Sequence, residues 1–86
     1  MTLVTLYTKS DCHLCEEARA VLDEVRAQQP FELAVRDITL DEDLHRAYFE
    51  RIPVVSVDGE ELFEYFVDAE LLRERLESSR RWPTEN

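Results

Sequence analysis

The chain has 86 residues, which allows one domain with one hydrophobic core, and we expect residues 1–86 to form that single domain. Its 44% hydrophobic content argues against disorder, while 35% charged residues and a formal charge of −10 give an acidic surface that disfavours nucleic acid as a partner. No apolar run approaches the roughly 18 residues of a membrane span, and the first residues lack the pattern of a secretory signal, so we expect a cytoplasmic protein with no membrane contact.

The first half of the chain predicts strands and helices in alternation. Residues 3–7 are a short run of β-forming apolar residues bounded by polar ones, which is typical of a buried strand. Residues 12–28 place apolar side chains at the spacing of one helical face, and Pro30 follows the last turn. A second strand is expected over residues 31–38, where apolar and polar residues alternate, and a short helix over residues 41–50, whose first turn is acidic.

The second half predicts a hairpin and a final helix. Pro53 is compatible only with the start or the edge of a strand, so a third strand is expected to begin there. Asp58 and Gly59 supply the turn chemistry of a tight hairpin, and residues 61–66 return as a fourth strand. Asp68 is a suitable N-cap for the final helix. The buried side of this helix is expected to carry Leu71, Leu72 and Leu76.

These elements predict an α/β domain with the order βαβαββα. A strand–helix–strand passage joins parallel strands through a right-handed crossover, and the terminal hairpin adds antiparallel strands to the same sheet. We therefore expect a mixed four-stranded sheet with helices on both of its faces.

Both cysteines of the chain lie at the junction between the first strand and the first helix. Cys12 stands where unpaired backbone N–H groups and the helix dipole stabilise an anion, and Cys-X-X-Cys arrangements lower a thiol pKa from about 8.5 to roughly 3.5–7.5. Cys15 follows three residues later, within reach of a disulfide. This arrangement predicts that Cys12 attacks a substrate disulfide and that Cys15 resolves the mixed intermediate.

The charged neighbours of Cys12 act in opposite directions. Lys9 and protonated His13 favour the thiolate, whereas Asp11 and the two glutamates after Cys15 oppose it, so we expect a moderate lowering of the pKa.

Other interpretations of the cysteine pair remain open on the residues alone. The pair could be two small buried apolar side chains in a binding module, or it could hold metal. A zinc site needs four ligands, and the chain offers only Cys12, Cys15, His13 and the distant His45, so we expect no metal site within one chain. A metal or an iron–sulfur centre shared between two chains is the remaining alternative.

The stretch TLYTKSDCHLCEEARAVL, followed by VRDI, RIPVVSVDG and a last helix, resembles the glutaredoxins of the thioredoxin-fold superfamily. It is especially similar to the small glutaredoxin-like proteins first catalogued as a domain of unknown function, over about residues 3–77. The resemblance implies a thioredoxin fold and a thiol–disulfide oxidoreductase. It implies that Cys12 is the nucleophile, that Cys15 is the resolving thiol, and that Pro53 is a cis-proline beside them. It also implies that the main chain of Ile52 pairs with a bound thiol partner like an added strand.

Three departures from the glutaredoxin pattern bear on glutathione. His13 and Leu14 replace the usual Pro-Tyr between the cysteines, Arg51-Ile52 replaces Thr-Val before the proline, and bulky residues 64–66 replace a Gly-Gly pair. These changes make dithiol chemistry a firmer expectation than glutathione binding.

Three charged residues are candidate anchors for glutathione. Asp68 corresponds to the acidic residue that receives the amino group, and Lys9 and Arg51 are candidate anchors for a carboxylate. Glutathione is thus expected as reductant or co-substrate, with a thioredoxin reductase as the alternative electron source. We expect no bound cofactor, a disulfide-containing protein or small molecule as substrate, and a monomer.

Overall fold

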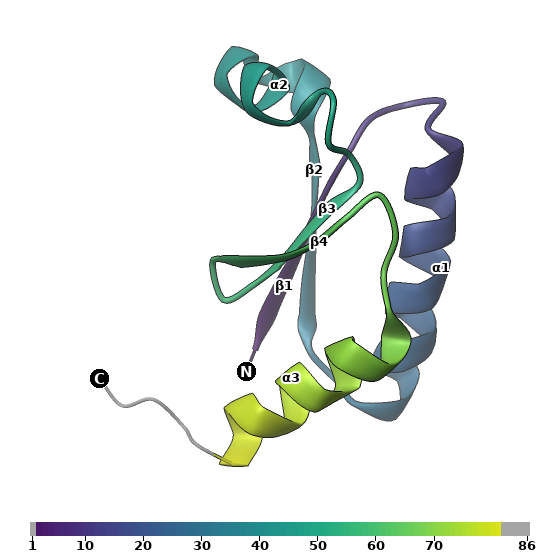
Figure 1. Ribbon diagram of the computed structural model, residues 1–86, viewed down its shortest axis with the longest axis vertical. Coiled ribbons are helices and arrows are strands. Elements are labelled where there is room, and N and C mark those ends of the chain that lie inside the picture. Colours follow the sequence, from purple (N-terminus) through teal and green to yellow (C-terminus); the bar gives the residue numbers. More distant parts are fainter. Residues whose placement is uncertain (1, 82–86) are drawn as a thin grey trace.

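The computed structural model describes residues 2–81, with side chains described through residue 78. The elements are ordered as the sequence predicts (Figure 1). In chain order they are β1 (Leu3–Thr8), α1 (His13–Gln28), β2 (Glu32–Asp37), the 3-10 helix η1 (Ile38–Leu40), α2 (Glu42–Tyr48), β3 (Val54–Val57), β4 (Glu60–Glu64) and α3 (Ala69–Arg81). No helix within residues 2–81 combines the length and the apolar character that crossing a bilayer requires.

The four strands form one mixed sheet in the order β2-β1-β3-β4. The β1 and β2 strands run parallel, whereas β3 is antiparallel to both β1 and β4. Leu6 at the centre of β1 is paired with Val35 in β2 and with Val55 in β3. The predicted mixed sheet is therefore confirmed, with β2 and β4 as its two edges.

The main core lies between the sheet and two helices. Alternate residues of β1 point to this side, and α1 and α3 cover it. Its buried members are Val4, Leu6, Ala18, Leu22, Val25, Phe31, Val55, Val57, Val67, Leu72 and Leu76. On the other side of the sheet, Tyr48 of α2 stacks on Tyr7 with the ring centroids 4.5 Å apart. Figure 1 shows α2 at the end of the sheet toward which β2 runs.

Several predicted boundaries shift for local reasons. The second strand ends at Asp37 because its carboxylate accepts hydrogen bonds from the backbone N–H and the hydroxyl of Thr39, at 2.9 and 2.6 Å, which caps η1. The third strand begins at Val54, one residue after Pro53. The fourth strand ends at Glu64, because Tyr65 adopts a positive φ of 72° that strand geometry excludes.

One of the three leucines predicted to be buried in α3 is exposed. Leu72 and Leu76 are buried as expected, four positions apart on one face. Leu71 is 53% exposed because the adjacent position lies about 100° around the helix.

This phase predicts unequal costs for neighbouring truncations. We expect Leu72→Ala to lower the free energy of unfolding by about 2–5 kcal/mol, the range for a buried leucine. The matched control Leu71→Ala should change it by no more than about 0.5 kcal/mol, as for exposed positions. Urea denaturation of both variants measures the difference, and equal losses would contradict the assigned burial of α3.

Candidate functional site

The loop from β1 to α1 fixes the position of Cys12. Asp11 has a positive φ of 62°, and Cys12 itself is extended, with φ −105° and ψ 106°. Cys12 is therefore the N-cap of α1, one residue before the first helical residue, His13. Its Sγ accepts a hydrogen bond from the backbone N–H of Cys15 at 3.2 Å. A sulfur in this place is held by the same interaction that normally serves a capping oxygen.

Cys12 and Cys15 form a disulfide, with their Cα atoms 5.2 Å apart. The two residues are unequally accessible, because Cys12 is partly exposed whereas Cys15 is only 3% exposed. A reagent in solution thus meets Cys12 first.

Buried apolar residues from distant parts of the chain surround Cys15. Cys15 packs with Ile38 and Ile52, and Tyr7 and Tyr48 flank this cluster. The Ile52–Pro53 peptide bond is cis. The fold therefore brings the cysteine pair and the Ile-Pro segment to one place.

The chain matches the family model described as "Glutaredoxin-like domain (DUF836)" over residues 3–77. The chain belongs to this family. The geometry around its cysteine pair is therefore that of a glutaredoxin-like protein with a cysteine arrangement suited to redox chemistry.

Solved structures resemble the chain in their fold. The solution structure of protein Ne2328 from Nitrosomonas europaea is 34% identical, with a TM-score of 0.76, covering 86% of this chain and 89% of that one. The X-ray structure of protein XcR50 from X. campestris is 36% identical, with a TM-score of 0.73 and coverages of 87% and 96%. A mutant thioredoxin from Halobacterium salinarum is 23% identical, with a TM-score of 0.66 and coverages of 90% and 73%. The thioredoxin fold expected for this glutaredoxin-like protein is confirmed.

The main chain beside the cis bond is only partly available to a ligand. The N–H of Ile52 donates to the carbonyl of Tyr48 at 3.1 Å, and the carbonyl of Pro53 accepts from the N–H of Tyr65 at 2.8 Å. No backbone donor within residues 2–81 is bonded to the Ile52 carbonyl. A peptide bound here could therefore donate a hydrogen bond to the Ile52 carbonyl, but the Ile52 N–H already donates within the protein.

Arg51 is held by carboxylates of the protein itself. Its guanidinium forms ion pairs with Glu61 and Glu64 of β4, and its cation lies 5.0 Å from the centre of the Tyr48 ring. Hydrogen bonds to Glu61 and Glu64 raise the pKa of Arg51. The Tyr48 hydroxyl donates to Glu61 at 2.8 Å, which raises the pKa of Tyr48 to about 12. Sequence reasoning did not find this network, since it depends on how α2 meets β4.

Asp68 caps α3, as the sequence predicts. Its Oδ1 accepts from the backbone N–H groups of Glu70 and Leu71, at 3.0 and 3.3 Å. The carboxylate expected to receive the amino group of glutathione is thus already bonded at one oxygen.

The remaining predicted residues lie around the cysteines. Lys9 is exposed and borders a surface pocket beside the disulfide. The His13 Nε2 lies 3.3 Å from the carboxylate of Glu17, one turn along α1, and both side chains are largely exposed. Leu14 is 44% exposed between the two cysteines. In the part of the chain that the structure describes, no three His, Cys, Asp or Glu side chains are grouped so that they could hold a metal ion.

Proposed function

We propose that this glutaredoxin-like protein is a thiol–disulfide oxidoreductase in which Cys12 is the nucleophile and Cys15 the resolving thiol. The observation that carries the proposal is the capping position of Cys12, whose Sγ accepts an N–H hydrogen bond at the positive end of α1. Such a position stabilises a thiolate, which is the reactive form of cysteine. The burial of Cys15 supports its proposed role as the resolving thiol. A substrate in solution does not meet this thiol, but the thiol can attack Cys12 once Cys12 is bound to the substrate.

The proposed reaction transfers two electrons to the substrate. The Cys12 thiolate attacks one sulfur of a substrate disulfide, which forms a mixed disulfide and releases the first substrate thiolate. The Cys15 thiolate then attacks Cys12 Sγ and releases the second. The protein ends with the Cys12–Cys15 disulfide and the substrate with two thiols.

The electron source that resets the dithiol is glutathione or a thioredoxin reductase. Two groups that would anchor glutathione are already bonded within the protein. Arg51 is paired with Glu61 and Glu64, and Asp68 caps α3. These contacts favour the reductase as the electron source. Comparing the two reductants in one turnover assay separates these routes. We place this activity in a monomer in the cytoplasm, acting on disulfides of proteins or small molecules without a bound cofactor.

A redox titration tests the function. The protein is equilibrated in glutathione buffers of stepped potential, free thiols are trapped, and the products are weighed by mass spectrometry. We expect a reversible loss of two hydrogens with a midpoint between roughly −300 and −120 mV, the span of dithiol catalysts. Thiols that stay reduced and unmodified throughout would refute the proposal. Visible absorbance and metal content of the fresh protein would then report the shared metal centre instead.

A further inference from the structure

The two edges of the sheet differ in how they are protected against pairing with another strand. An edge strand presents unpaired backbone groups, and proteins often block such edges with bulges or with charges. The β4 edge has both features: its register with β3 shifts between Val55 and Ser56, and its side chains include Glu60, Glu61 and Glu64, which would repel a second copy of the strand. The β2 edge has an even register with β1 and carries charges of both signs.

The backbone groups of β2 that face away from β1 belong to Leu33 and Val35. The N–H of Glu32 donates to the carbonyl of Thr2 at 2.8 Å, so the backbone groups of Glu32 point toward β1. Because successive residues of a strand direct these groups to opposite sides, those of Leu33 and Val35 point outward. Among the described residues, no loop and no side chain bonds to them. The edge thus offers the N–H and the carbonyl of both residues to another strand.

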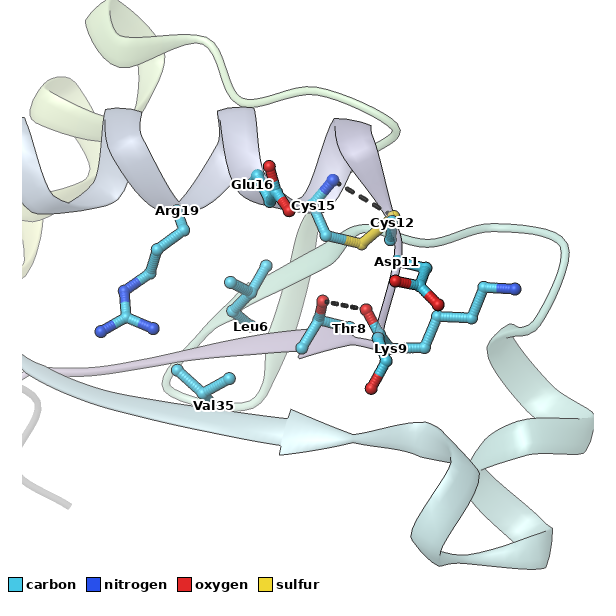
Figure 2. A pocket seen from close by; sticks show the side chains of 10 residues that line it. Leu6, Thr8, Lys9, Asp11, Cys12, Cys15, Glu16, Arg19 and Val35 are labelled. Carbon is cyan, nitrogen blue, oxygen red and sulfur yellow. Dashed lines mark hydrogen bonds between the residues drawn. A yellow bond between two sulfur atoms is a disulfide. The ribbon is translucent and has the colours of Figure 1, made fainter.

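The helix α1 leaves this edge uncovered. Val35 is paired with Leu6 and shares its side of the sheet, yet Val35 is 43% exposed whereas Leu6 is buried. Figure 2 shows Val35 on β2 and Arg19 extending toward β2 from α1. The side of β2 that faces the helices is therefore open at its outer edge.

The charges of β2 match those of the same strand running in the opposite direction. In an antiparallel pair centred on Ala34, Glu32 of each copy lies opposite Arg36 of the other. Opposite charges in such cross-strand positions are favourable. Both side chains are exposed, and neither has a hydrogen bond or an ion pair among the described residues. Both are therefore available to a second copy of the chain.

The same register also suits the backbone and the smallest side chain of the strand. Leu33 of each copy lies opposite Val35 of the other, so their outward N–H and carbonyl groups exchange two hydrogen bonds. Ala34 lies at the two-fold axis in a non-hydrogen-bonded position, where facing Cα atoms approach to about 4.5 Å and a methyl group fits. A register centred on Val35 would set Arg36 opposite Ala34 and lose both charge pairs.

We propose that two copies of this chain associate through antiparallel pairing of their β2 strands, centred on Ala34, which joins two four-stranded sheets into one of eight strands. One chain holds both cysteines, so the proposed activity needs no second copy, and this inference does not rest on that activity. The contact is one short strand edge between two chains of charge −10, so the dimer is weak and reversible. It forms at high protein concentration from the monomer that carries the activity.

Sedimentation velocity at concentrations up to about 1 mM, in about 0.15 M salt to screen the net charge, tests this association. We expect the wild type to pass from monomer toward dimer over this range. Arg36→Glu and Glu32→Arg each turn both cross-strand pairs into like charges, which should weaken the association about tenfold. Mixed in equal amounts, the two variants should associate again, because each chain then faces opposite charges. A wild type that stays monomeric throughout, or a mixture that associates no better than the separate variants, would overturn the inference.

Arg46→Glu is the matched control. It makes the same change of charge at an exposed position of α2, and it should leave the association unchanged. A loss equal to that of Arg36→Glu would show that net charge governs the association, and the pairing of β2 would then be wrong.

A cysteine probe tests the register. In a Cys12→Ser, Cys15→Ala background, Ala34→Cys places the two introduced thiols opposite each other, with a Cα separation inside the range of a disulfide, about 4.4–6.8 Å. Val35→Cys is its control, because the two copies of that position are offset along the strands and lie beyond this range. We expect mild oxidation to cross-link Ala34→Cys but not Val35→Cys. Equal yields, or a higher yield for Val35→Cys, would overturn the register and the charge pairing that carries the proposal.

Discussion

Cys12→Ser is expected to lower the rate of disulfide reduction by about 1,000-fold or more, because a serine hydroxyl is not ionised near neutral pH and is a weak nucleophile without a base. Cys12 is partly exposed whereas Cys15 is buried, so we expect a substrate to meet Cys12 and to find no equivalent route at Cys15. The measurement is reduction of hydroxyethyl disulfide by the variant and the wild type, each supplied with the same excess of reductant.

The control for this variant concerns folding rather than chemistry. Serine is a favoured N-cap, so Cys12→Ser keeps a side-chain acceptor for the N–H of Cys15. We therefore expect the variant and the reduced wild type, which both lack the disulfide, to unfold within about 1 kcal/mol of each other. Activity within tenfold of wild type in a folded variant would remove Cys12 from the role of nucleophile.

The periodicity of apolar residues predicted the order of the elements and the sheet, while local chemistry set where they end. The β2 strand ends early because the Asp37 carboxylate accepts a hydrogen bond from the backbone N–H two residues later. The β4 strand ends early because the backbone of Tyr65 has a positive φ. Neither the hydrogen bond of Asp37 nor the backbone conformation of Tyr65 changes the periodicity of apolar residues, so the periodicity does not predict these strand ends. The misplaced Leu71 has a related cause, since three leucines within six positions fix a helical face only when the helix phase is known.

The meeting of the cysteine pair with the Ile-Pro segment was predictable because a sequence resemblance covers both. The partners of Arg51 were not, because its contacts with Glu61 and Glu64 require that the end of α2 lie beside β4.

Cys15→Ser is expected to stop the reaction after its first step. Cys12 should still attack the substrate, but without the second thiol the mixed disulfide persists and accumulates to roughly one adduct per chain. With oxidised glutathione as substrate, mass spectrometry should show one added glutathione, whereas the wild type passes to its internal disulfide. Turnover supported by a thioredoxin reductase should fall to background, because that route needs the Cys12–Cys15 disulfide as its substrate.

Two further variants separate the resolving role of Cys15 from its packing. Cys15 is buried against Ile38 and Ile52, so a serine hydroxyl there costs about 1–3 kcal/mol of stability where it finds no partner. Cys15→Ala avoids that hydroxyl and should trap the same adduct. The double variant Cys12→Ser with Cys15→Ser should form none. Reductase-supported turnover by Cys15→Ala at the wild-type rate would show that Cys12 acts alone, and Cys15 would then be a core residue only.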